Sequence, residues 1–240
     1  SGLPVSCDVL VVGAGPAGSA CALWLARAGQ RVMLVDAQTF PRDKVCGDGL
    51  IPDAHAALQQ LGVLDEVMAA AHRVGHVACI APRGGRVDVP GTLAVLPRRQ
   101  LDEILRAAAV RAGANFHAPW RFEAPRMEHG RDIGARLKSG DQLAQVDARW
   151  VVLATGAVPQ ALIAADMCTR RLPTGVALRG YVKNPAMTRH ITEMEVVWHS
   201  KLRPGYGWIF PCGDGVFNIG AGVLHGHNEV RDDGKAGMKD

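Results

Sequence analysis

Six residues near the N-terminus have the types and the spacing of a phosphate-binding turn. Residues 13–18 read Gly-Ala-Gly-Pro-Ala-Gly, which is a G-x-G-x-x-G pattern. In such a turn the first glycine permits a tight bend, the second lets backbone N–H groups approach a pyrophosphate, and the third lets the next helix pack closely. The N-terminus of that helix adds a partial positive charge. The pattern therefore predicts a dinucleotide site that includes Gly13, Gly15, Pro16, Ala17 and Gly18.

The elements around this turn are those that a dinucleotide site requires. Residues 7–12 form a short apolar run, typical of a buried parallel strand, and residues 16–28 have the Ala- and Leu-rich composition of a helix. Residues 31–35 predict a second strand, which Asp36 closes. Asp36 lies 23 residues after Gly13, where its carboxylate can accept hydrogen bonds from both ribose hydroxyls.

Two later segments narrow the type of dinucleotide. Arg98 opens a segment with the periodicity of an amphipathic helix, and Ala154-Thr155-Gly156 follow an apolar strand at residues 150–153. Together with the N-terminal motif, these segments resemble the flavoprotein family that includes p-hydroxybenzoate hydroxylase and the geranylgeranyl reductases. The resemblance implies that the cofactor is FAD, that Arg98 contacts it, and that the Ala-Thr-Gly segment packs beside it.

Two further segments resemble the geranylgeranyl reductases in particular. Residues 41–47 read Pro-Arg-Asp-Lys-Val-Cys-Gly and are similar to their P-x-x-K-x-C-G loop, which lies near the flavin ring. Residues 206–222 match their Y/F-x-W-x-F-P-x(7–8)-G-x-G signature at every specified position. The resemblance implies a flavin-proximal role for Cys46, as a catalytic proton source or as a group lining the ring. The further cofactor-binding residues that it implies are Lys44, Cys46, Gly47, Arg98, Ala154, Thr155 and Gly156.

The aromatic residues of the signature also have a physical interpretation. Residues at positions i and i+2 of a strand share one face, so Tyr206, Trp208 and Phe210 point to the same side. They could wall an apolar slot for a lipid or another hydrophobic substrate. A pair of aromatic core residues is the plainer alternative.

The order of the elements predicts the fold class. We expect an α/β fold in which a Rossmann-like FAD-binding domain (residues 1–75 and 98–160) is interleaved with an antiparallel β-rich substrate domain (residues 76–97 and 161–240). Members of the family continue with a later Gly-Asp motif at the flavin. The Gly-Asp pairs of this chain do not follow the second β-rich segment, so we expect a C-terminally truncated chain that lacks part of the flavin site.

The resemblance predicts an enzyme, an FAD-dependent oxidoreductase that reduces carbon–carbon double bonds of a prenyl-type hydrophobic substrate. Because the chain has a single G-x-G-x-x-G, electrons would come transiently from NAD(P)H or from a reduced protein donor. Three alternatives stay open. They are a flavin-dependent monooxygenase or halogenase acting on an aromatic substrate, an electron-transfer flavoprotein that reduces a quinone, and an inactive fragment without flavin.

The composition of the chain limits the kinds of partner that we expect it to bind. The net charge of +4 is scattered along the chain, which disfavours a nucleic-acid groove. No Cys-x-x-Cys pair or histidine cluster has zinc-ligand spacing, so we expect no metal site. The six cysteines are expected to be free thiols in the cytoplasm. No apolar run reaches the roughly 18 residues of a membrane-spanning helix, so any membrane contact would be peripheral.

Overall fold

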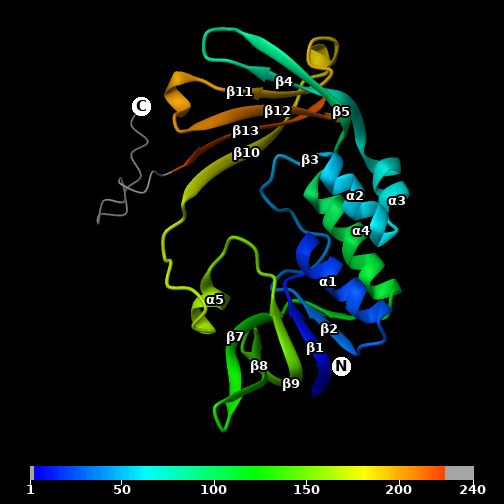
Figure 1. Cartoon of the computed structure of the whole chain (residues 1–240), viewed down its shortest axis with the longest axis vertical. Coiled ribbons are helices and arrows are strands. Elements are labelled where there is room, and N and C mark those ends of the chain that lie inside the picture. Colours follow the sequence, from blue (N-terminus) through cyan, green and yellow to red (C-terminus); the bar gives the residue numbers. More distant parts are fainter. Residues whose placement is uncertain (1–2, 225–240) are drawn as a thin grey trace. The chain divides into compact units, whose positions relative to one another are not determined.

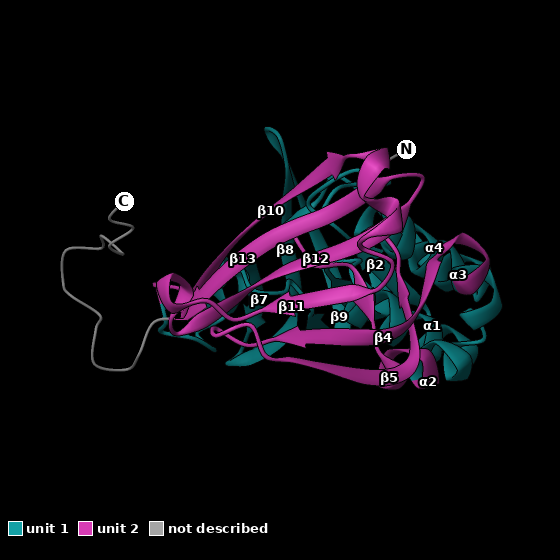
Figure 2. Cartoon of the chain, turned by 90° about the horizontal axis from the view of Figure 1, so that it is seen from above, with its two compact units in different colours: residues 1–44, 57–67, 98–170 teal, residues 45–56, 68–97, 171–240 magenta. Residues whose placement is uncertain are grey.

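The computed structural model describes residues 3–224 of the chain, and its elements are labelled in Figure 1. Its residues fall into two compact units, coloured separately in Figure 2. Unit 1 consists of Ser1–Lys44, Ala57–Val67 and Arg98–Arg170, and unit 2 consists of Val45–Ala56, Met68–Pro97 and Arg171–Asp240.

Unit 1 is built on a six-stranded sheet with parallel and antiparallel halves. The strand order is β6 (Asn115–His117), β2 (Val32–Val35), β1 (Ser6–Val12), β9 (Gln142–Leu153), β8 (Arg131–Ser139) and β7 (Arg121–Glu128). The first four strands are parallel to one another, and β9, β8 and β7 form an antiparallel meander. All four residues of β2 are buried, as expected of a parallel strand.

Helices complete unit 1. Helix α1 (Pro16–Arg27) follows β1 directly and packs against α4 (Arg98–Arg111), and a short α5 (Gln160–Ala164) follows β9. The chain also forms α2 (Pro52–Leu61) and α3 (Leu64–Ala70). A cluster of buried apolar residues joins β1, β2, β8 and β9, and it consists of Cys7, Leu10, Val12, Met33, Val35, Ala135, Leu137, Val146 and Ala148. This core fixes the end of β1, where the glycine turn begins.

Unit 2 is built on a seven-stranded sheet. The strand order is β10 (Gly175–Lys183), β13 (Val216–Leu224), β12 (Gly205–Gly213), β11 (Met194–Val197), β4 (His72–Ile80), β5 (Arg86–Val95) and β3 (Gly49–Leu50). Neighbouring strands are antiparallel except β4 and β11, which are parallel. Two short 3-10 helices, η1 (Pro185–Arg189) and η2 (Ser200–Leu202), join strands of this sheet.

The predicted fold class, an α/β Rossmann-like part interleaved with an antiparallel β-rich part, is confirmed. One strand prediction was too short, because the strand expected at residues 150–153 is the end of the longer strand β9. Pro90 and Gly91 interrupt the sequence pattern of β5, but a register shift between Val74 and His76 accommodates them.

Candidate functional site

The glycine turn of unit 1 requires glycine for steric reasons. Gly13 has φ of +101°, and a Cβ atom there would collide with the carbonyl oxygen of Ala154. A Cβ atom on Gly18 would likewise collide with the carbonyl oxygen of Gly13. Helix α1 begins at Pro16, and its N-cap residue Gly15 makes no side-chain capping bond. The first N–H groups of α1 are therefore left for an anionic group.

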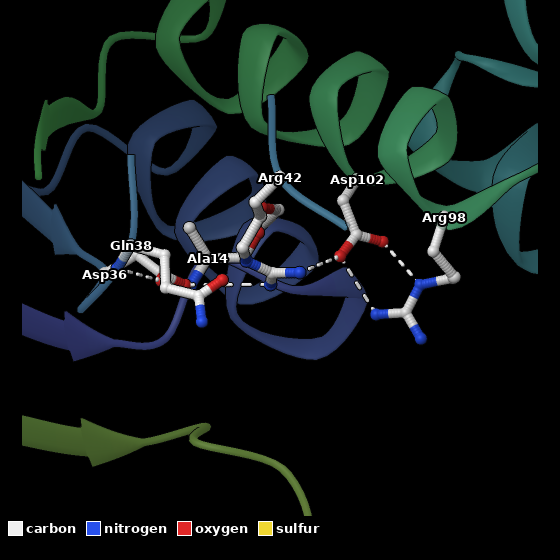
Figure 3. Close-up of polar contacts among 7 residues, drawn as sticks. Ala14, Asp36, Gln38, Arg42, Arg98 and Asp102 are labelled. Carbon is white, nitrogen blue, oxygen red and sulfur yellow. Dashed lines mark hydrogen bonds and ion pairs between the residues drawn. The ribbon is translucent and has the colours of Figure 1, made fainter. Parts of the chain in front are cut away.

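Asp36 stabilises this turn through backbone hydrogen bonds. Its side chain is buried after the end of β2, and Oδ2 accepts a hydrogen bond from the backbone N–H of Ala14 at 2.8 Å. The other oxygen, Oδ1, accepts one from the N–H of Gln38 at 2.9 Å. Each carboxylate oxygen can accept a second hydrogen bond, so the predicted role of Asp36 toward a ribose is compatible with these contacts. Figure 3 shows the carboxylate beside the turn.

Two arginines lie at the same turn. A Cβ atom on Gly15 would be 3.6 Å from Nη2 of Arg42 and 3.8 Å from Nη2 of Arg98. Both guanidinium groups contact the fully buried carboxylate of Asp102. Arg98 donates two hydrogen bonds to Asp102, at 2.6 and 2.9 Å, and Nη1 of Arg42 lies 3.0 Å from its Oδ2. The arginines are thus held where a pyrophosphate would sit if the turn binds one.

The four charged groups form one continuous chain of polar contacts, as Figure 3 shows. Nη2 of Arg42 is 3.7 Å from Oδ2 of Asp36, which links Asp36 to Asp102 and Arg98. The sequence predicted the positions of Asp36 and Arg98 but no role for Arg42 or Asp102. The spacing of Arg98 and Asp102, four residues apart on one helix, is a signal that could have identified that pair.

The residues around the turn fit a bound dinucleotide. Thr155 follows β9, and its Oγ1 is buried without a hydrogen-bond partner among residues 3–224. Its backbone nitrogen would lie 3.2 Å from a Cβ atom on Gly13, so the threonine is adjacent to the turn. Ala154 and Gly156 flank it, and Gly156 has φ of +75°. The turn itself carries little side-chain bulk, and beside it lie an uncapped helix N-terminus, two arginines and the unpaired hydroxyl of Thr155. Together these features suit a phosphate-containing cofactor such as FAD.

Unit 2 contains a pocket of about 470 Å³. Its walls come from the loop after residue 44 and from the strands β10, β12 and β13. The lining residues are Val45, Cys46, Gly47, Thr174, Gly175, Val176, Ala177, Gly205, Tyr206, Trp208, Phe210, Gly222, Val223 and Leu224. Most of these side chains are apolar. The three aromatic residues of the signature thus lie around one pocket, together with Cys46 and Gly47 of the loop.

The aromatic wall is continuous. The ring centroid of Tyr206 is 6.2 Å from that of Trp208 and 6.2 Å from that of Trp198. Trp208 is buried, whereas Tyr206 is exposed over almost half of its surface. The neighbouring strand leaves room for the indole, because a Cβ atom on Gly220 would collide with Cζ2 of Trp208. Gly220 of the signature therefore makes space for Trp208.

The predicted site residues fall into two groups. The glycine turn, Asp36, Lys44, Arg98 and residues 154–156 belong to unit 1. Cys46, Gly47 and the three aromatic residues belong to unit 2 and line its pocket. Within residues 3–224, no group of three or more His, Cys, Asp or Glu side chains is arranged to hold a metal ion. The described helices include none that is long and apolar enough to span a membrane.

The sequence also missed a polar cluster in unit 2, in which Asp48 and Asn218 are buried and Tyr181 is partly exposed. Asp48, Tyr181 and Asn218 are linked by hydrogen bonds next to the pocket wall. Burial, followed by the hydrogen bond to Asp48, raises the pKa of Tyr181 well above its usual value, so its hydroxyl stays protonated and donates. Burial also raises the pKa of the Cys212 thiol, to about 11.

Comparison with known proteins identifies the family. The FAD binding domain family matches residues 6–166. Menaquinone reductase of Mycolicibacterium smegmatis is 37% identical over 234 residues, which cover 90% of this chain and 55% of the relative. Digeranylgeranylglycerophospholipid reductase 2 of Methanopyrus kandleri is 30% identical over 94% of this chain and 57% of its own length. The chain thus spans somewhat more than half the length of these relatives.

A solved structure supports the same assignment of the fold. The geranylgeranyl bacteriochlorophyll reductase-like protein of Thermoplasma acidophilum superposes with a TM-score of 0.75 at 24% identity, covering 91% of this chain and 57% of that protein. The family indicated by the N-terminal glycine motif and the four other sequence segments is confirmed by these comparisons. The chain belongs to the FAD binding domain family, and geranylgeranyl reductases are among its relatives.

Proposed function

We propose that this chain is part of an FAD-dependent oxidoreductase that reduces carbon–carbon double bonds in a prenyl group of a hydrophobic substrate. The observation that carries the proposal is the apolar pocket of unit 2, which combines an aromatic wall with the Cys46–Gly47 loop. Its volume of about 470 Å³ lies within the range of about 300–1,000 Å³ that is common for small-molecule sites. The names of the relatives support a substrate with prenyl groups.

The residues of unit 1 would hold the cofactor. The N–H groups at the start of α1 and the bare backbone of Gly13 and Gly15 would bind the pyrophosphate. Arg42 and Arg98 would add charge at the same place, and Asp36 would accept hydrogen bonds from the ribose. Bound reduced FAD supplies a hydride equivalent for transfer to a substrate carbon.

The residues of unit 2 would hold the substrate. Tyr206 and Trp208 line the pocket and would contact an apolar chain, and the other apolar lining residues would exclude water from the double bond. Saturation needs one hydride and one proton per double bond. We assign the proton to the thiol of Cys46, which lines the pocket and would recover its proton from solvent. NAD(P)H or a reduced protein donor would supply the electrons.

Because prenyl lipids partition into bilayers, we further propose that the protein acts in the cytoplasm at the membrane surface. A vesicle flotation assay tests this part of the proposal. Co-flotation with vesicles that contain the prenyl substrate is expected, and exclusion from them would contradict it.

The reaction is tested by single turnover. The protein is loaded with FAD, reduced without oxygen and mixed with geranylgeranyl diphosphate. Reoxidation of the flavin, together with a mass gain of two hydrogens per saturated double bond, is expected. The matched control is the fully saturated phytanyl diphosphate, which should not reoxidise the flavin. A protein that retains reduced FAD and leaves every prenyl double bond intact would refute the proposal.

Reduction of a quinone ring is a second candidate, favoured by the similarity to a menaquinone reductase. Menaquinone carries both a quinone ring and a prenyl side chain, so the two reactions give different products from one substrate. Mixing the reduced protein with menaquinone and analysing the product by mass spectrometry after air oxidation separates them. Air returns a quinol to the starting quinone, whereas a saturated side chain keeps its two extra hydrogens.

A further inference from the structure

A polar cluster of Asn218, Asp48 and Tyr181 contacts the lining residues of the pocket of unit 2. Asn218 on β13 is fully buried and Asp48 is 2% exposed, whereas Tyr181 is 39% exposed. Buried polar groups destabilise a fold unless they are paired, and buried charges more so. In this cluster the buried groups are paired with one another and with the residues of the pocket wall. None of its members was singled out by sequence motifs, since Asn218 falls within the unspecified spacer of the aromatic signature.

The amide of Asn218 contacts two walls of the pocket at once. Its Nδ2 donates to the carbonyl oxygen of Cys46 at 2.8 Å and to Oδ2 of Asp48 at 2.6 Å. Its Oδ1 accepts a hydrogen bond from Nε1 of Trp208 at 2.9 Å. Both N–H donors and the acceptor are used, which fixes the orientation of the amide. The loop and the indole are thereby tied to one side chain.

Asp48 extends the connection to a third strand. The hydroxyl of Tyr181 on β10 donates to its carboxylate. Tyr181 lies directly opposite Asn218 in the register of β10 and β13, and Asn218 lies opposite Phe210 on β12. Asp48 also has φ of +66°, a strained conformation for a residue other than glycine.

The loop and the wall pack closely. A Cβ atom on Gly47 would lie 3.2 Å from Cε2 of Phe210 and 3.5 Å from Nε1 of Trp208. A small displacement of the loop would therefore change the shape of the pocket. The main-chain oxygen of Asp48 accepts a hydrogen bond from the N–H of Leu96 at 3.0 Å, which anchors the other side of the loop to the end of β5.

We propose that Asn218, supported by Asp48 and Tyr181, is a positioning residue that locks the Cys46–Gly47 loop to the Trp208 wall and so fixes the shape of the pocket. It does not touch the reacting atoms. Its effect on an apolar substrate rests on the proposed function, whereas its effect on the loop does not. The loop can therefore be tested separately from the reaction.

The experiment uses the whole 240-residue chain and three variants. Asn218→Asp keeps the acceptor for Trp208 but cannot donate to Cys46 or Asp48, and it places two carboxylates side by side. Tyr181→Phe is milder, because it removes a single hydroxyl. The control is Asn184→Asp, since Asn184 is exposed in the same unit and makes no side-chain capping bond. Circular dichroism establishes that each variant is folded.

The first readout is the rate at which iodoacetamide alkylates Cys46, measured by peptide mass spectrometry against Cys168 as an internal reference. We expect alkylation about tenfold faster in Asn218→Asp, which corresponds to about 1.4 kcal/mol of lost anchoring. About threefold is expected in Tyr181→Phe and no change in Asn184→Asp. Unchanged alkylation in a folded Asn218→Asp overturns the proposal. If that variant does not fold, unchanged alkylation in Tyr181→Phe overturns it.

The second readout is the quenching of tryptophan fluorescence by geranylgeraniol, together with KM and kcat for prenyl reduction. We expect weaker binding and a KM about tenfold higher in Asn218→Asp, with a smaller change in kcat and no change in FAD content. A fall in kcat and FAD content at constant KM would contradict a positioning role. If the wild-type chain reduces no prenyl substrate, the proposed function fails, while faster Cys46 alkylation still supports the lock.

Discussion

Replacing Asp102 by asparagine should weaken both the fold and the binding of FAD. The carboxylate is fully buried, and it pairs with Arg98 and Arg42, whose side chains are 15% and 11% exposed. The asparagine side chain keeps one acceptor oxygen but loses the charge and one oxygen. Hydrogen bonds that involve charged groups contribute about 1.5–3 kcal/mol each. Loss of one of them, together with the charge, predicts a fall of about 2–3 kcal/mol in the free energy of unfolding.

The effect on FAD follows from the position of the arginines. In the wild-type chain Asp102 holds both guanidinium groups within 4 Å of the space above Gly15. Without the charge they are no longer pre-oriented, so binding must supply the cost of ordering them. We expect the dissociation constant of FAD to rise about tenfold, equivalent to about 1.4 kcal/mol. Urea denaturation without FAD and titration by flavin fluorescence quenching measure the two quantities.

The neighbouring residue provides the matched control. Glu103 lies on the same helix and pairs with Arg106 at 2.6 and 2.9 Å, but its side chain is 35% exposed. Since ion pairs near the surface contribute little, Glu103→Gln should change stability by less than about 1 kcal/mol and leave FAD binding unchanged. If Asp102→Asn behaves like Glu103→Gln in both assays, then the buried carboxylate does not organise the arginines and the reasoning is wrong.

Three further predictions concern glycines and one partly buried thiol. Gly13→Ala should abolish FAD binding, because the new Cβ atom would collide with the carbonyl oxygen of Ala154 and because φ is positive there. Gly29→Ala also has a positive φ, of +78°, but open space around it, so it should only lower the free energy of unfolding by about 1 kcal/mol. Equal FAD affinity in the two variants would contradict this prediction. Gly220→Ala should displace the adjacent indole and raise the KM for prenyl substrates at least tenfold, whereas Gly180→Ala, with open space, should not; equal KM values would argue against the crowded wall. Because burial raises the pKa of Cys212 from 9.0 to about 11, the stability that its neutral thiol contributes is complete below pH 9 and is lost as the pH rises through about 11. Cys212→Ala should therefore flatten the fall in urea stability between those pH values, and an unchanged slope would exclude this thiol as the cause.

The features that the sequence predicted well are local ones. The turn at Gly13, the helix after it and the acid at Asp36 lie within one βαβ unit, so spacing along the chain reports their spacing in the fold. The motif of aromatic residues and glycines also lies on two consecutive strands, β12 and β13, joined by a short turn. Alternation along these strands then determines which side chains share a face.

The features that it missed depend on contacts between distant segments. Asn218 and Asp48 are 170 residues apart, and nothing in either segment indicates that they meet. The parallel pairing of β4 with β11 could not be predicted from the sequence either, because Val77 and Met194 are separated by strands and helices of both units. Arg42 occupies an unspecified position of the P-x-x-K-x-C-G loop. Its role depends on the approach of α4, which periodicity alone does not place.

The strand order of unit 2 has a consequence for synthesis on the ribosome. Its sheet takes β3 to β5 from residues 49–95 and β10 to β13 from residues 175–224. The early hairpin of β4 and β5 must therefore wait, with one edge unpaired, until β11 has been translated. Such non-local pairing slows folding and exposes an edge strand to other chains. Newly made chains should thus pass through an interval in which a chaperone that shields strand edges improves the yield.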